Sequence, residues 1–202
     1  FSSAEELEAL LFQRGKHKLL QMVKQISALA DIRFIRQKYP RGLGDAVGAA
    51  KELVGDEPFA VILPDDIIAA PVPCLKQMLD LYAHLQAPLV AVQEVPDEDL
   101  PRYGMVQPAT DDYLCCLAKG FEEKPKRKLS PANLAIIGRY ILSPAIFPLL
   151  DKATPGLNGE IQLTDSLNLL AQTEKIYAYR FYGMRFDVGD KLGFILANLT
   201  FA

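Results

Sequence analysis

The sequence has 202 residues, of which 50% are hydrophobic and 23% are charged, so it can bury a core of one domain or two closely joined lobes. A net charge of −3, with scattered basic residues, disfavours a nucleic-acid or anionic-membrane partner. No apolar run is long enough to span a bilayer, and three cysteines and two histidines show no metal-ligand spacing. We therefore expect a cytoplasmic protein.

The first half alternates helical and strand patterns. A helical stripe of leucines over 2–30 is divided by Gly15, so one helix or two are both compatible with it. The run Phe59-Ala-Val-Ile-Leu63 is typical of a strand buried on both faces. Such alternation predicts a mostly parallel sheet covered by helices. The remaining elements expected here are strands at 32–35 and 88–95, and helices at 45–54 and 72–86.

The second half favours short strands followed by helices. The prolines and charges at 96–102 mark the best candidate for a boundary between lobes, and no internal repeat is present. We expect strands at 104–107, 113–117, 120–123, 134–142 and 177–182, and helices at 144–150, 159–172 and 191–201.

Two carboxylates, Asp65 and Asp66, directly follow the strand at 59–63. This is the carboxyl end of a strand, where open α/β proteins bind ligands, and oxygen ligands there suit Mg²⁺. A structural turn is the competing interpretation, because proline and aspartate favour turns.

A glycine-rich segment, Tyr39-Pro-Arg-Gly-Leu-Gly44, precedes the helix expected at 45–54. Glycines let the backbone approach a ligand at a helix N-terminus, and the Gln37 amide could bind a pyrimidine edge. Many such turns are structural, and both interpretations stay open.

Polar residues in three further segments could be functional or structural. Lys124, held against Pro125, can neutralise a phosphate or belong to a solvated surface. Glu160, at a helix start, can accept bonds from sugar hydroxyls or favour the helix dipole. Asp187 and Asp190 precede the last helix, where Asp190 could be an N-cap.

Together, and in this order, these segments resemble the bacterial UTP–glucose-1-phosphate uridylyltransferase family of the sugar-1-phosphate nucleotidyltransferase superfamily. The match runs over almost the whole chain. Its most specific parts are Gly159-Glu-Ile-Gln-Leu-Thr-Asp165 and Asp187-Val-Gly-Asp-Lys-Leu-Gly193. The other matching segments are Arg36-Gln-Lys, Gly42-Leu-Gly44, Leu63-Pro-Asp-Asp66, Arg102-Tyr-Gly104, Glu123-Lys-Pro125 and Asn133 to Tyr140.

The resemblance implies a fold and a set of site residues. The fold would be α/β and Rossmann-like, of the nucleotide-diphospho-sugar transferase type, with a mostly parallel central sheet flanked by helices and a smaller sugar-binding lobe. Residues 1–202 would form one domain, with a nucleotide-binding lobe at 1–100 and a sugar-binding lobe and C-terminal helix at 101–202. Gln37 and Gly42 would bind the nucleotide, Gly104, Gly138 and Glu160 the sugar, Lys124 the sugar phosphate, and Asp65 and Asp187 the metal, with Lys124 and Asp65 catalytic.

The implied reaction is transfer of UMP from UTP to glucose 1-phosphate, which gives UDP-glucose and pyrophosphate with Mg²⁺ as cofactor. The sugar phosphate would attack the α-phosphorus in line, so that positioning and charge stabilisation supply the catalysis. The resemblance also implies a homo-oligomer, with no nucleic-acid or membrane partner.

One feature of the family is missing from this sequence: a first strand and a glycine-rich loop that carries an arginine. We therefore expect the sequence to be part of a longer molecule, and a chain complete as written to show very little catalysis. Two alternatives remain, a thymidylyl or cytidylyl transferase of the same superfamily and a catalytically silent sugar-nucleotide-binding domain.

Overall fold

The structure is a computed structural model that describes residues 4–110, 112–156 and 159–202. These form two compact units, Phe1–Arg36 and Gln37–Ala202. The division into lobes at residue 100 stays a prediction. Within the described ranges, no helix is both long and apolar enough to cross a bilayer.

The first unit contains two helices, α1 (Glu5–Gln13) and α2 (His17–Ser27). Gly15 separates them with a φ of +62°, a left-handed conformation that stops a helix, so the stripe forms two helices. The strand expected at 32–35 is wrong. Its side chains are largely exposed, Phe34 by 79%, and among the described residues no strand pairs with it. A β-branched run forms a strand only where a partner strand exists, so this segment stays irregular.

The second unit is built on a six-stranded sheet with the order β1-β6-β3-β7-β5-β4, in which β4 also pairs with β6. A second sheet pairs β2 with β8. The strands are β1 (Phe59–Ile62), β2 (Asp66–Ala69), β3 (Leu89–Glu94), β4 (Gly104–Pro108), β5 (Cys115–Glu123), β6 (Leu134–Leu142), β7 (Tyr177–Arg180) and β8 (Met184–Asp187).

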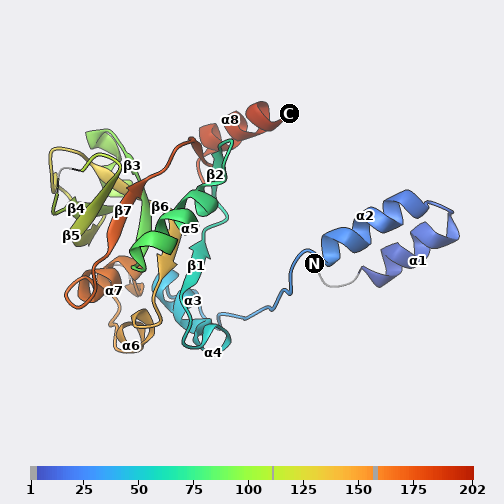
Figure 1. The fold of residues 1–202 in the computed structure, drawn as a ribbon, viewed down its shortest axis with the longest axis horizontal. Coiled ribbons are helices and arrows are strands. Elements are labelled where there is room, and N and C mark those ends of the chain that lie inside the picture. Colours follow the sequence, from blue (N-terminus) through green and yellow to red (C-terminus); the bar gives the residue numbers. More distant parts are fainter. Residues whose placement is uncertain (1–3, 111, 157–158) are drawn as a thin grey trace. The chain divides into compact units, whose positions relative to one another are not determined.

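Helices flank the large sheet, which confirms the α/β class (Figure 1). Val90 and Val92 of β3 pack into a core with the group α3, α6 and α7, whereas Leu89 and Ala91 pack with Met78 of α5. The side chains of these first four residues of β3 are therefore all buried, as expected of a strand covered on both faces. The helices are α3 (Leu43–Ala49), α4 (Lys51–Val54), α5 (Cys74–Leu85), α6 (Ile146–Asp151), α7 (Leu163–Leu170) and α8 (Lys191–Phe201), with a 3₁₀ helix η1 (Asp97–Arg102).

The expectation of a mostly parallel sheet is wrong, because most of the strand pairings that the structure describes are antiparallel. Strands β1, β3, β4 and β7 run one way, but β5 and β6 run the other way between them. Among the described residues, β3 and β7 are therefore the one neighbouring pair in the large sheet with parallel bonding. The sheet is mixed because the second half of the chain adds its long strands in the opposite direction.

The prediction that β1 is buried on both faces is wrong. Phe59 and Val61 are partly buried, but Ala60 and Ile62 are exposed, Ile62 by 52%. In the part of the chain that the structure describes, β1 pairs with β6 alone and forms an edge of the sheet. The apolar run therefore predicted the strand correctly, but it did not predict that the strand lies at the edge of the sheet.

Candidate functional site

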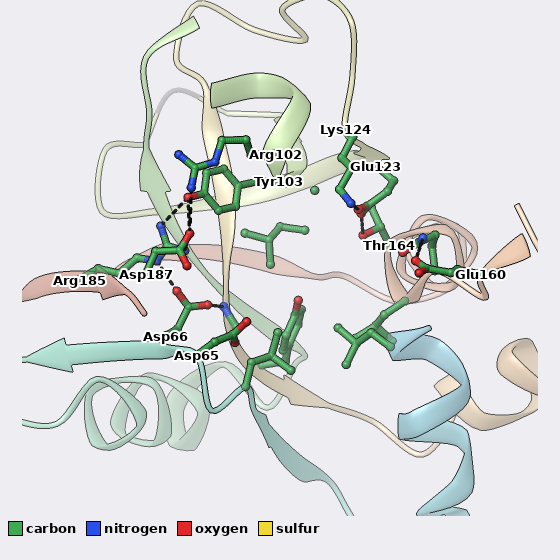
Figure 2. Close-up of a pocket in the computed structure, with 18 residues that line it drawn as sticks. Asp65, Asp66, Arg102, Tyr103, Glu123, Lys124, Glu160, Thr164, Arg185 and Asp187 are labelled. Atoms are coloured by element: carbon green, nitrogen blue, oxygen red, sulfur yellow. Dashed lines mark hydrogen bonds and ion pairs between the residues drawn. The ribbon is translucent and has the colours of Figure 1, made fainter. Parts of the chain in front are cut away.

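A cavity of about 300 Å³ lies where the ends of several strands of the second unit meet (Figure 2). The β1–β2 turn, the start of β4, the end of β5, the middle of β6, the start of α7 and β8 all contribute side chains to it. The lining residues are Leu43, Leu63, Asp65, Asp66, Arg102, Tyr103, Gly104, Glu123, Lys124, Ile136, Gly138, Tyr140, Glu160, Gln162, Leu163, Thr164, Arg185 and Asp187.

One side of the cavity brings two predicted metal ligands together. Strands β2 and β8 pair with Asp66 opposite Asp187, and the Val188 N–H donates to the Asp65 carbonyl oxygen at 2.8 Å. A Cβ placed on Gly189 would lie 3.2 Å from Asp187 Oδ1 and 3.7 Å from Asp65 Oδ2. The two carboxylates, 122 positions apart in sequence, therefore flank the same small space.

The neighbouring carboxylate, Asp66, is buried and fully engaged. Its Oδ2 accepts the Gly138 N–H at 2.9 Å, and its Oδ1 accepts from Arg185 Nε. Asp66 therefore ties β2 to β6 and β8 and leaves the exposed Asp65 as the carboxylate that is available to a ligand.

A tyrosine and two arginines surround Asp187. Its Oδ2 accepts the Tyr103 hydroxyl at 2.8 Å and lies 3.4 Å from both Arg102 Nη2 and Arg185 Nη2. Burial raises the pKa of Tyr103, so its hydroxyl remains a hydrogen-bond donor. Burial acts to lower the pKa of Arg185, but the hydrogen bonds and charges of Tyr103 and Asp66 outweigh it and raise that pKa.

The opposite side of the cavity contains Lys124, the predicted phosphate-binding residue. Its Nζ lies 3.8 Å from Glu123 Oε1, and Glu123 Oε2 accepts the Thr164 hydroxyl at 2.7 Å. The backbone of Lys124 has a φ of +46°, which is unusual for a residue other than glycine. Its N–H donates to the Tyr103 carbonyl at 3.1 Å, which joins the end of β5 to the turn before β4. Strained residues of this kind cluster at functional sites.

The predicted sugar-site glycines fit closely packed positions beside these groups. A Cβ on Gly104 would lie 2.9 Å from Thr164 Oγ1 and 3.0 Å from Glu123 Oε2. A Cβ on Gly138 would lie 2.5 Å from Leu63 Cβ and 2.8 Å from Asp66 Oδ2. At both positions the absence of a side chain lets functional side chains come close to the backbone.

The glycine-rich loop and the Glu160 segment, two separate motifs in sequence, bind each other through the backbone. The Ile161 N–H donates to the Arg41 carbonyl at 2.6 Å, and the Gly44 N–H donates to the Ile161 carbonyl at 2.9 Å. Gly42 has a φ of +98°, and a Cβ there would lie 2.8 Å from the Ile161 oxygen. Glu160 lines the cavity, where its Oε2 accepts from Gln162 Nε2 at 2.9 Å.

Gln37 and Gly42 are not among the residues that line the cavity. Gln37 Nε2 instead donates to Asp45 Oδ2 at 2.5 Å and to the Gly42 oxygen at 3.4 Å. The bond from Gln37, together with Arg41, holds the pKa of Asp45 below its usual range. These contacts fix the loop next to the cavity through Leu43, which does line it.

A metal ion would find few protein ligands here. Across residues 4–110, 112–156 and 159–202, no three His, Cys, Asp or Glu side chains form a group that could hold an ion. Asp65 and Asp187 nevertheless offer two carboxylates around one space, and Mg²⁺ commonly uses one or two carboxylates with substrate phosphates and water. The donor set therefore fits Mg²⁺ bound together with a phosphate-bearing substrate.

The structure thus gathers six of the eight predicted site residues around one cavity: Asp65, Gly104, Lys124, Gly138, Glu160 and Asp187. Sequence reasoning assigned no role to Tyr103, Glu123, Thr164 or Arg185, and it considered Asp66 only as a Mg²⁺ ligand, not as the buried link between strands that the structure shows. The signal for four of them was present, since all except Arg185 lie inside segments already singled out by the resemblance. Arg185 lies two positions before such a segment, and its contact with Asp66 depends on strand register.

A family model described as nucleotidyl transferase matches residues 2–202. The chain belongs to the nucleotidyl transferase family. A curated Bacillus subtilis (strain 168) protein named UTP–glucose-1-phosphate uridylyltransferase is 48% identical to it over 202 residues, which is 100% of this chain and 69% of that protein. The resemblance drawn from the sequence motifs is thereby confirmed.

Solved structures agree with the fold of this nucleotidyl transferase chain. A UDP-glucose pyrophosphorylase complexed with UDP-glucose is 39% identical, covers 93% of this chain and 72% of its own, and has a TM-score of 0.84. A UTP-bound enzyme of the same name from Acinetobacter baumannii is 36% identical over 100% of this chain and 70% of its own, with a TM-score of 0.87.

Proposed function

We propose that this nucleotidyl transferase transfers UMP from UTP to glucose 1-phosphate and so makes UDP-glucose and pyrophosphate. The observation that carries the proposal is the cavity itself, which combines the carboxylates Asp65 and Asp187 on one side with Lys124 and Glu160 on the other. The names of the relatives, a uridylyltransferase at 48% identity and structures with UDP-glucose or UTP, support this substrate pair.

The proposed roles follow from charge and position. Lys124 neutralises the phosphate of glucose 1-phosphate as a point charge, and Glu160 accepts hydrogen bonds from sugar hydroxyls. Gly104 and Gly138 let the sugar approach the backbone. Gln37 and Gly42 bind the uracil edge. Neither residue lines the cavity, so this contact is made by the loop beside the cavity.

Asp65 and Asp187 are the residues that we propose hold Mg²⁺, which when bound supplies positive charge against the phosphates. A general base is unnecessary, because the attacking phosphate oxygen already carries a negative charge. The protein then contributes mainly position and electrostatic stabilisation: it aligns the sugar phosphate with the α-phosphorus, and Lys124 offsets the negative charge of the attacking phosphate as it approaches.

The cellular setting is also a proposal. Cys74, Cys115 and Cys116 are free thiols, which supports a reducing compartment such as the cytoplasm. A homo-oligomeric state and a division into nucleotide and sugar lobes at residue 100 rest on the family resemblance.

The test is pyrophosphate release from UTP and glucose 1-phosphate with Mg²⁺, by purified protein of measured intact mass. We expect release from the wild type, a fall of at least about 10-fold to 100-fold in Asp65→Ala, and little change in Asp80→Ala. Asp80 is a matched control, because its carboxylate forms an exposed ion pair with Lys76 on α5 and such pairs contribute little.

Three results would contradict the proposal. Release that is equal in Asp65→Ala and wild type would remove Asp65 from the reaction. Faster turnover with dTTP or CTP than with UTP would reassign the base preference, and no release by a folded protein that binds UDP-glucose would favour a silent binding domain.

A further inference from the structure

We infer that Arg185 is a positioning residue that fixes the Asp65–Asp187 edge of the cavity in a geometry able to bind a divalent cation. The inference rests on the proposed function for the identity of that cation. Arg185 matches none of the segments that carry the family resemblance, so what points to it is the structure.

Each nitrogen of the Arg185 guanidinium faces a different partner (Figure 2). Nε donates to Asp66 Oδ1, Nη1 donates to the Tyr103 hydroxyl oxygen at 3.2 Å, and Nη2 lies 3.4 Å from Asp187 Oδ2. The guanidinium carbon also lies 4.8 Å from the centre of the Tyr103 ring. One planar group therefore connects β2, the turn before β4 and β8.

The connection extends to a fourth segment. Asp66, which accepts from Arg185, also accepts the Gly138 N–H of β6 through its second oxygen. Removal of the guanidinium would therefore take one partner from each of Asp66, Tyr103 and Asp187 at the same time.

Burial protects the contact between Arg185 and Asp66 from water. The side chains of Arg185 and Asp66 are each 9% exposed, so water does not compete for their hydrogen bonds. Arg102 also contacts Asp187, but its side chain is 46% exposed and it can move away when a ligand binds. Of the two arginines, Arg185 is the one that sets the position of the carboxylate.

Lysine cannot replace arginine in this arrangement, because an ammonium is a single point charge and cannot meet three partners in a fixed plane. Arg185→Lys keeps the positive charge beside buried Asp66 and so avoids an unpaired buried carboxylate. It removes the fixed geometry and retains the charge, which separates positioning from simple charge compensation.

Arg180 provides a matched control. It lies on β7, its guanidinium carbon is also 4.8 Å from a tyrosine ring centre, that of Tyr113, and it does not line the cavity. Arg180→Lys therefore repeats the same chemical change at a similar packing site outside the functional cavity.

The experiment measures Mn²⁺ binding by electron paramagnetic resonance, with and without UDP-glucose, in wild type, Arg185→Lys and Arg180→Lys. We expect Arg185→Lys to weaken Mn²⁺ binding by about 10-fold to 100-fold, as is usual for residues that orient metal ligands, and Arg180→Lys to leave it unchanged. If Arg185→Lys does not fold, the double variant Asp66→Asn/Arg185→Met, which removes both buried charges, is expected to show the same loss.

Unchanged Mn²⁺ affinity in the folded Arg185 variant, or no Mn²⁺ binding by the wild type, would overturn the inference. Pyrophosphate release is measured on the same samples. If the wild type releases no pyrophosphate but its Mn²⁺ binding depends on Arg185, the proposed function is refuted and the positioning role is supported.

Discussion

Gly138 offers a direct test of how closely the cavity floor is packed. In Gly138→Ala, the new Cβ would lie 2.5 Å from Leu63 Cβ, 2.7 Å from Leu63 Cγ and 2.8 Å from Asp66 Oδ2. Carbon atoms pack best at about 3.5–4.0 Å, so the β1–β2 turn must move by roughly 1 Å or more. Overpacking of this kind costs about 1–3 kcal/mol, and the loss of a strand glycine returns about 0.5–1 kcal/mol through the unfolded state.

The expected net effect is a loss of about 1–2 kcal/mol in the free energy of unfolding. Urea unfolding followed by circular dichroism measures it, since the sequence contains no tryptophan. Gly48→Ala is the control: Gly48 lies inside α3, where the nearest atom to its Cβ is Leu150 Cβ at 3.9 Å, so we expect a gain of about 0.5–1 kcal/mol.

The two glycine substitutions should therefore have opposite signs. Equal or greater stability of Gly138→Ala than wild type, with the expected gain in Gly48→Ala, would show that the turn is not packed as described. The rate of pyrophosphate release should also fall in Gly138→Ala, under conditions in which the variant is still folded. The reason is that the Asp66 carboxylate loses its 2.9 Å bond from the Gly138 N–H.

Two further predictions concern Lys124 and Cys74. The free energy of unfolding of Lys124→Gly should be about 1 kcal/mol larger than that of Lys124→Ala, because the φ of +46° favours glycine. Both variants should lose most pyrophosphate release. Equal free energies of unfolding in urea would refute the backbone argument. Burial raises the pKa of Cys74 from its ordinary 9.0 to about 11, so the unfolded thiol ionises first and stability falls as pH rises from 9.0 to about 11. Urea unfolding across that range should show a shallower decline in Cys74→Ala than in wild type, and identical declines would contradict this assignment.

The sequence predicts best those elements whose signal is local. Strand β6 (Leu134–Leu142) and helix α8 (Lys191–Phe201) have the expected bounds, because each has a long apolar pattern and a clear break at both ends. Asp190 is indeed the N-cap of α8, since its side chain accepts from Leu192 N and Gly193 N. The helix expected at 159–172 is shorter, Leu163–Leu170, and the strands expected at 113–117 and 120–123 form the single strand β5.

The small sheet was missed for a physical reason. Strands β2 and β8 have four residues each, and their partners lie more than 110 positions apart in the chain. Asp66–Ala69 does not alternate, and the apolar–polar alternation of Met184–Asp187 covers only four residues, which is too short to identify a strand by itself. The pairing of Asp66 with Asp187, on which the site depends, becomes visible only when the register is known.

The candidate site shows the same contrast between residue type and contact. Asp65 and Lys124 could be singled out because a carboxylate and an amine at strand ends suggest chemistry, and Glu160 because it stands at a glycine-rich helix start; all three line the cavity. Arg185 could not be singled out, because the arginine in Met184-Arg-Phe186 has no local sequence feature that distinguishes it from a surface residue. Its importance comes from three partners supplied by separate segments.

The geometry also implies that the site is held by polar contacts more than by hydrophobic burial. An isolated pair of four-residue strands is at best marginally stable, so β2 and β8 need other support. Arg185 provides it through Asp66, and Arg139 of β6 adds hydrogen bonds to the carbonyl oxygens of Leu63 and Asp66. Because these bonds can break without opening the apolar core between β3 and α7, the cavity edge can rearrange at a lower free energy than global unfolding. Loss of the Arg185 contacts would thus loosen the Asp65–Asp187 edge while the six-stranded sheet stays intact.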